Sequence, residues 1–171
     1  LGRLLARREP HRHGRRRQGA ARVGRALRVW DASGLSSPPL QKLDAHRYGI
    51  ESVAYLPDGS RIATVGYDRA LRVWDASNLS SPLLERLNAH SGSIRSVAYS
   101  PDGSRIATVG WDNALRVWDA SHLSSPLLQK LDAHSGRIAT VGGDNSITSV
   151  AYSPDGSRIA TVGWDRALRV W

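Results

Sequence analysis

Short stretches that alternate apolar and polar residues recur along most of the chain. IESVAYL at 50–56 alternates in this way, and the turn residues PDGS follow it at 57–60. The next apolar stretches are RIATV at 61–65 and ALRVW at 70–74, which a tight GYDR turn separates. After a polar loop comes LLERL at 83–87. Short runs bounded by Gly, Pro, Asp and Ser predict β-strands joined by tight turns.

This four-strand pattern is one unit of an internal repeat. Residues 47–90 and 91–134 are two nearly identical units of 44 residues, each with all four expected strands. A partial copy with only the third and outer strands covers 25–46, and 135–171 is a copy that ends before its outer strand. Four antiparallel strands in about 40–45 residues are the pattern of a propeller blade. We therefore expect an all-β chain, a partial β-propeller of four-stranded antiparallel blades that forms an open arc rather than a closed ring.

Three motifs mark the units: Ala-His before the first strand, Pro-Asp-Gly after it, and Val-Trp-Asp at the end of the third. On these motifs the chain resembles the WD-repeat family over nearly all of residues 25–171, as a fragment of a longer propeller. The resemblance implies a hydrogen-bonded structural tetrad of His, Ser/Thr, Asp and Trp in each blade. Carried over by position, the three sets are His46, Thr64, Asp68 and Trp74; His90, Thr108, Asp112 and Trp118; and His134, Thr161, Asp165 and Trp171.

The chemistry of these side chains supports such a tetrad. The Asp can accept from one imidazole nitrogen, the other nitrogen can engage the Thr hydroxyl, and that hydroxyl can accept the indole N–H. Buried polar groups linked in this way are satisfied and would fix the geometry of the blade. His, Asp and Ser/Thr also make up catalytic triads, but a triad is one unique arrangement and this set recurs with the repeat. The histidines are too far apart for a local zinc motif. We therefore expect no catalytic residue, no metal and no cofactor.

Positions that vary against the fixed repeat indicate where a partner would bind. The residue before each tetrad Asp is aromatic, and it falls in the turn between the second and third strands, which in the WD-repeat family lies on the top face. The residue after the Asp and a residue near the start of each first strand vary as well. The candidates are Tyr67, Arg69, Trp111, Asn113, Trp164, Arg166, Glu51, Arg95 and Thr148. Exposed Trp, Tyr and Arg favour binding; the alternative is that the aromatic side chains pack between adjacent blades.

Two segments depart from the repeat. The nine residues RIATVGGDN at 137–145 are extra; they copy a second strand with its turn, and we interpret them as the remnant of a lost blade. Residues 1–24 do not match the repeat, and we expect them to be disordered or derived from a frameshift. One nucleotide string that encodes them reads SAAYSPDGSRIATVGGDRALRVW in a shifted frame, which is nearly a blade of this repeat. A transit peptide and an arm that binds nucleic acid or anionic lipid are the alternatives.

Almost all of the net charge of +9 comes from residues 1–25. Residues 1–25 hold nine Arg and one Glu, whereas the other 146 residues hold 15 basic and 14 acidic groups. The repeats themselves are therefore not expected to bind nucleic acid. The chain has no Cys, which excludes disulfides. It also has no apolar run near the about 20 residues of a membrane-spanning helix, so no membrane partner is expected.

These observations favour a non-catalytic protein-interaction scaffold made of WD repeats, part of a larger regulatory or signalling protein. Its partner would be a protein or peptide on the top face. The open blade edges also predict self-association, and an arc short of a closed ring should be marginally stable. The alternative is a non-functional translated fragment of a degenerate or misassembled WD-repeat gene. In-frame repeats in the flanking DNA would favour the scaffold, and stop codons would favour the fragment.

Overall fold

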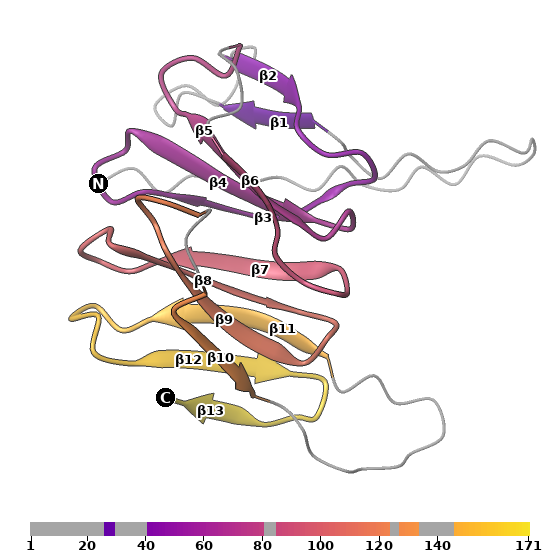
Figure 1. Cartoon of the computed structure of the whole chain (residues 1–171), viewed down its shortest axis with the longest axis vertical. Helices are drawn as coiled ribbons and strands as arrows, with labels where there is room; N and C mark the ends of the chain where they lie inside the picture. Colours follow the sequence, from indigo (N-terminus) through magenta and orange to yellow (C-terminus); the bar gives the residue numbers. More distant parts are fainter. Residues whose placement is uncertain (1–25, 30–40, 81–84, 124–126, 134–145) are drawn as a thin grey trace, which may run out of the picture.

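The computed structural model describes residues 26–29, 41–80, 85–123, 127–133 and 146–171. These residues form β-strands and tight turns, and the strands make four antiparallel sheets (Figure 1). Across this part of the chain there is no helix with the length and apolar character needed to cross a membrane. No sheet of the described residues closes on itself, which confirms the expected all-β fold of an open partial propeller.

The sheets follow one another along the sequence. The first has two strands, β1 (Ala26–Val29) and β2 (Gln41–Asp44). Blade 1 runs in the order β3 (Ile50–Tyr55), β4 (Arg61–Gly66), β5 (Ala70–Asp75) and β6 (Glu85–Asn88). Blade 2 runs in the order β7 (Ile94–Tyr99), β8 (Arg105–Gly110), β9 (Ala114–Asp119) and β10 (Gln129–Asp132). Blade 3 has three strands among the described residues, β11 (Ile147–Tyr152), β12 (Ile159–Gly163) and β13 (Leu168–Val170).

The turn between the first two strands of each blade is built by local chemistry. In blade 1, Asp58 accepts hydrogen bonds from the backbone N–H and the hydroxyl of Ser60, at 2.8 and 2.7 Å. Gly59 has a φ of 78°, in the left-handed region that glycine adopts without a steric penalty. Its N–H donates to the Leu56 carbonyl at 2.8 Å. The Pro-Asp-Gly motif therefore reverses the chain with its polar groups satisfied.

Each first strand carries a β-bulge near its start. Ile50 lies opposite Gly66 and Ser52 lies opposite Val65, which leaves Glu51 without a partner in the register. The same irregularity recurs at Arg95 in β7 and at Thr148 in β11. The chain passes very close to itself here, because a Cβ on Gly66 would lie 1.9 Å from the Gly49 carbonyl oxygen. A bulge redirects the extra side chain, so these three variable residues take equivalent places at one end of the blades.

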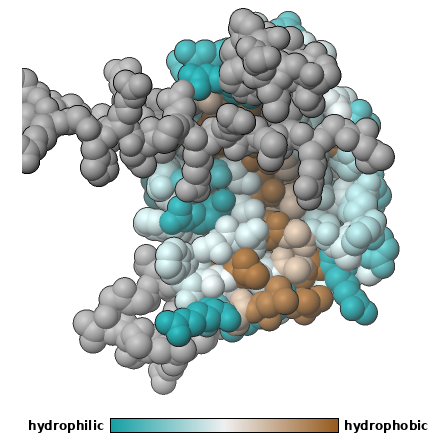
Figure 2. Space-filling model, turned by 180° about the vertical axis from the view of Figure 1, so that it is seen from behind, coloured by the Kyte–Doolittle hydropathy of each residue, from teal (hydrophilic) through white to brown (hydrophobic). Residues whose placement is uncertain are grey.

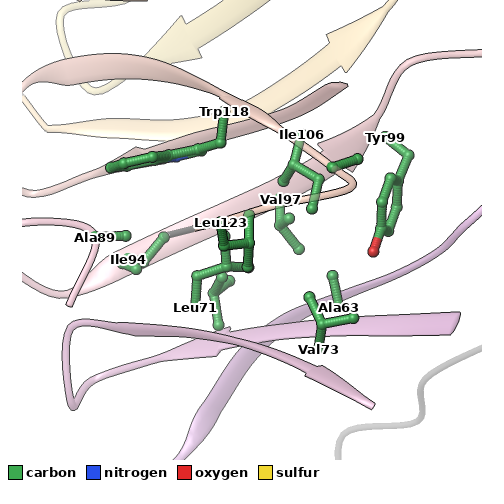
Figure 3. Close-up of a cluster of buried hydrophobic side chains, with 12 residues drawn as sticks. Ala63, Leu71, Val73, Ala89, Ile94, Val97, Tyr99, Ile106, Trp118 and Leu123 are labelled. Atoms are coloured by element: carbon green, nitrogen blue, oxygen red, sulfur yellow. The ribbon is translucent and has the colours of Figure 1, made fainter. Parts of the chain in front are cut away.

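The blades stack face to face, with the inner strands β3, β7 and β11 side by side (Figure 1). We call the face that a blade turns toward the next one in the sequence its forward face, and the opposite one its rear face. The forward face of blade 1 packs on the rear face of blade 2, where Ala63, Leu71 and Val73 point toward Ile94 and Val97 (Figure 3). The hydrophobic core therefore lies between blades rather than inside any one of them.

Some of the expectations fall on residues outside the described ranges. They include the segment 1–24, the extra residues 137–145 and the third tetrad histidine, His134. The interpretation of these segments as a frameshifted blade and a lost-blade remnant stays a prediction. So does the division of the chain into units at 25–46, 47–90, 91–134 and 135–171.

Candidate functional site

In blade 1 the four tetrad residues form one chain of hydrogen bonds. The indole N–H of Trp74 donates to the Thr64 hydroxyl at 2.9 Å. His46 joins that hydroxyl to Asp68, with its Nε2 2.8 Å from Thr64 Oγ1 and its Nδ1 2.8 Å from Asp68 Oδ1. A neutral imidazole with its proton on Nδ1 satisfies these contacts, because Nδ1 then donates to Asp68 and Nε2 accepts from Thr64. The chain links β5 and β4 to the segment that leads into β3.

Blade 2 repeats this arrangement almost unchanged. Nε2 of His90 lies 2.8 Å from Thr108 Oγ1, and its Nδ1 lies 2.7 Å from Asp112 Oδ1. The Trp118 indole donates to Thr108 at 3.0 Å. The histidine and threonine of each set are buried. Two sets with the same geometry, one in each complete blade, indicate that the arrangement belongs to the blade rather than to a single site.

In blade 3 the described part of the set is more open. The Trp171 indole donates to the Thr161 hydroxyl at 3.1 Å. Trp171 is 40% exposed, whereas Trp74 and Trp118 are each 7% exposed. Asp165 accepts from the Ala167 backbone N–H at 3.1 Å. Because His134 lies outside the described residues, the structure shows only this indole–hydroxyl pair and the aspartate of the third set.

An arginine from each third strand joins the network, although it was not among the residues predicted from the sequence. Nη1 of Arg72 lies 2.7 Å from Asp68 Oδ2, and Arg116 pairs with Asp112 at 2.6 Å. Arg169 pairs with the aspartate of blade 3 at 2.5 Å. The signal was present, because every unit has an arginine four residues after the tetrad Asp. Arg72 is buried, whereas Arg116 and Arg169 are partly buried.

The surroundings keep the histidines neutral and the aspartates charged. Burial lowers the pKa of His46 and of His90, against the opposing effect of their aspartate partners. Burial alone would raise the pKa of Asp68, but hydrogen bonds from His46 and Arg72 outweigh it and lower the pKa. Asp112 has a lowered pKa for the same reasons. At neutral pH the networks of blades 1 and 2 therefore each hold one Asp–Arg ion pair beside an uncharged imidazole.

The predicted binding residues lie at one end of the blades, in the turns between the second and third strands and at the bulges. The turns share a geometry in which the residue after the Asp is left-handed: φ is 62° at Arg69, 58° at Asn113 and 63° at Arg166. Asparagine tolerates this conformation better than arginine does. The turn presents the aromatic residue two positions earlier. Trp111 is 44% exposed and Trp164 is 65% exposed.

Four of the predicted residues form one cluster across the junction of blades 1 and 2, which we call the Arg95 cluster. The Arg95 guanidinium lies 4.9 Å from the ring centroid of Trp111 and 5.9 Å from that of Tyr67. Its Nη1 lies 2.8 Å from Glu51 Oε2. A hydrogen bond between the Tyr67 hydroxyl and Glu51 raises the pKa of Tyr67. The Arg95 guanidinium therefore contacts the rings of Tyr67 and Trp111, and the Glu51 carboxylate balances its charge.

The remaining predicted residues are not members of this cluster. Arg69 lines a hollow of about 810 Å³ together with Tyr67, Asp68, Arg47 and Tyr48. In blade 3, Thr148 takes the bulge position of Arg95 and donates instead to the Val162 carbonyl at 3.1 Å. Asn113 lies in the turn between the second and third strands of blade 2, and Trp164 and Arg166 lie in that of blade 3. The two junctions between blades therefore differ in chemistry at the bulge position: Glu51 and Arg95 form an ion pair between blades 1 and 2, whereas Thr148 takes this position in blade 3.

Comparison with known proteins agrees with this architecture. The family model for the WD domain, G-beta repeat, matches residues 37–75, 81–119 and 125–171. Each matched stretch contains the outer strand of one sheet and the first three strands of the next, so consecutive repeats interlock by one strand. No curated protein matches the chain at a significant level.

Repeats of this family generally form protein-interaction scaffolds and are generally not enzymes. The three matches cover most of the sequence. They coincide with the antiparallel sheets and their repeated Trp–Thr–His–Asp networks. This chain therefore belongs to the WD-repeat family.

Proposed function

We propose that the chain is a non-catalytic protein-interaction scaffold whose partner, a protein or peptide, binds the top face at the Arg95 cluster. The observation that carries this proposal is that the indole of Trp111 is 44% exposed, while hydrogen bonds and an ion pair of the surrounding turn fix its position. A rigid aromatic side chain loses little conformational freedom on binding and can bury a large apolar area. We further propose that the chain is the propeller part of a larger regulatory or signalling protein.

The contacts of the turn explain why this surface is preorganised. The Trp111 backbone N–H donates to the Ser93 carbonyl at 2.9 Å, and the Asn113 N–H donates to Gly110 at 3.2 Å. Between them Asp112 is anchored by His90 and Arg116. The buried network therefore acts as a support for the exposed indole. We infer that the tetrad has a positioning role at this surface in addition to stabilising the blade.

The charges around the cluster indicate what kind of partner would fit. Arg95 is paired with Glu51, but Arg47 and Arg69 are exposed and line the neighbouring hollow with Tyr48. A peptide that places an apolar side chain against Trp111 and an acidic side chain near these two arginines would satisfy both features. We propose a partner of this kind for the top face.

A catalytic role for the His–Thr–Asp sets is not supported by their surroundings. The Thr64 and Thr108 hydroxyls belong to side chains with no exposed surface, and their histidines are buried. A nucleophile must reach the reacting atom of its substrate, and here the blade itself encloses it. The sets are accordingly assigned a structural role in this proposal.

The test uses peptides selected from a random library for binding to the intact chain. Trp111→Ala should weaken the selected peptides that bind the top face by about tenfold or more while leaving the melting curve nearly unchanged. Leu128→Ala is the matched control, because Leu128 is also exposed and lies beside the outer strand of the same blade. Unchanged peptide affinity would refute the site. A large loss of stability in Trp111→Ala would instead assign the indole to packing between blades.

A further inference from the structure

The hollow beside the β4–β5 turn of blade 1 collects many of the differences between two nearly identical repeat units. Residues 47–90 and 91–134 differ at eleven of their 44 positions. Eight residues line the hollow, and five of these eight differ between the units. The other three are Asp68, Arg72 and His90, which belong to the buried networks. Only six of the remaining 36 positions differ, so the variation is concentrated on the wall of the hollow.

Three of these five differences make the hollow of blade 1 more positive. Blade 1 carries Arg47, Arg69 and Asn88 at these positions. The residues at the same positions of the next unit are Ser91, Asn113 and Asp132. Blade 1 therefore has two additional positive charges and lacks one negative charge, all in one hollow. Substitutions that change the charge in a single direction indicate an anionic ligand.

The two arginines of the hollow are available to such a ligand. They lie among the turns of the blades, and Figure 2 shows hydrophilic residues at both sides of the stack with apolar ones between them. Among the described residues, no carboxylate forms an ion pair with Arg47 or Arg69. The third arginine, Arg72, differs because Asp68 balances its charge at 2.7 Å. The hollow thus has two positive charges in excess, which match a phosphate monoester better than a single carboxylate.

The hollow also has room and an aromatic wall for the rest of the ligand. Its volume of about 810 Å³ lies within the range of small-molecule sites. Tyr48, which takes the place of Gly92 in the next unit, is 53% exposed, and Tyr67 lines the same hollow. The Arg47 guanidinium lies 5.3 Å from the centroid of the Tyr48 ring, so the cation and the aromatic ring are side by side. Tyrosine rings stack on planar rings such as nucleobases.

We propose that this hollow binds a small phosphate monoester with a planar ring, a ligand of the nucleotide class, through Arg47, Arg69 and Tyr48. Guanidinium groups form charge-assisted, bidentate hydrogen bonds with phosphate oxygens, and the ring of the ligand stacks on the tyrosine. A carboxylate at position 88 would repel the phosphate, which Asn88 avoids. The ligand occupies the two arginines that are proposed above to attract an acidic side chain of the partner, so it excludes that side chain and leaves Trp111 free.

The first test is calorimetric titration of the intact chain with adenosine monophosphate at about 50 mM salt, where exposed charges are only weakly screened. A dissociation constant below about 1 mM is expected. Adenosine lacks the phosphate and inorganic phosphate lacks the ring, so each should bind at least about tenfold more weakly. A weaker dissociation constant for the monophosphate would overturn the proposal. So would an equal affinity for adenosine or for inorganic phosphate, because either would show that one half of the ligand is not recognised.

The second test places residues of the next unit in the hollow. Arg47→Ser and Asn88→Asp should each weaken the binding of adenosine monophosphate by at least about tenfold. Blade 2 has the same residues at these positions, so both variants should fold, and circular dichroism checks each. Arg105→Ser is the matched control, because it removes an exposed arginine at the end of β8 away from the top-face turn. Its affinity should be unchanged.

Binding that is unchanged in both hollow variants would overturn the proposal, because the ligand would then lie on another basic segment such as residues 1–25, which hold nine Arg. An equal loss in Arg105→Ser would also overturn it, since the effect would then follow the net charge rather than the hollow. Neither test uses a peptide. Failure of this site can therefore be distinguished from failure of the partner site at Trp111.

Discussion

Replacing Thr108 by valine tests the buried network with the smallest change of shape. The Thr108 side chain has no exposed surface, and its hydroxyl is the common partner of the Trp118 indole at 3.0 Å and of His90 Nε2 at 2.8 Å. Valine fills nearly the same volume but offers neither a donor nor an acceptor. The indole N–H and the imidazole nitrogen would then both be buried without a partner.

The expected loss of stability follows from those two groups. A buried donor or acceptor left unsatisfied costs about 1–3 kcal/mol, so the two groups together should destabilise Thr108→Val by about 2–6 kcal/mol. Thr64→Val should cost a similar amount, because Thr64 has the same two partners in blade 1.

The assay is urea unfolding at pH 7.5, followed by tryptophan fluorescence at one fixed protein concentration, because association would change the apparent stability. Thr148→Val is the matched control: its hydroxyl contacts a single carbonyl at a partly exposed site, so its effect should stay within about 0.5 kcal/mol. A loss below about 1 kcal/mol at both Thr64 and Thr108 would refute the reasoning.

Three further predictions concern the same networks and turns. An unfolded histidine has a pKa of about 6.5, and burial lowers the pKa of His46 and His90 in the fold, so below pH 6.5 the unfolded chain binds more protons. Stability should therefore be complete above pH 6.5 and fall as the pH drops from 6.5 to 5, by up to about 1.4 kcal/mol per pH unit for each histidine; urea midpoints that stay flat over this range would contradict it. Arg116→Met leaves the Asp112 carboxylate without its cation and should cost about 1–3 kcal/mol in urea unfolding, whereas the exposed control Arg105→Met should cost almost nothing. Arg69→Asn places a residue suited to a φ of 62° in the turn, as Asn113 already is, and should raise the stability by about 0.5 kcal/mol; a lower urea midpoint would count against strain at this position.

The sequence by itself was enough for the blades and for most of each network. Period-two alternation and the Pro-Asp-Gly turns are local signals, and they placed the first three strands of blade 1 within one residue of their observed bounds. The His, Thr, Asp and Trp positions were carried over from the resemblance to the WD-repeat family. The outer strand was expected at 83–87; residues 83 and 84 lie outside the described ranges, and the described strand, Glu85–Asn88, ends one residue later than expected. Its polar and apolar residues alternate over too short a stretch to fix its ends.

Contacts between blades were decided by the tertiary structure. Arg72 was not predicted to join the network, because its contact with Asp68 is seen only in the folded blade. The stacking of Arg95 between Tyr67 and Trp111 joins residues from two blades, and no local pattern encodes such a contact. The third strands show this most clearly: Leu71 has no exposed surface and Leu168 is 67% exposed, although both lie in the same ALRVW sequence. The local sequence is enough to form the strand. Whether its side chains are buried depends on another sheet packing against them, and that packing arises only when the blades come together.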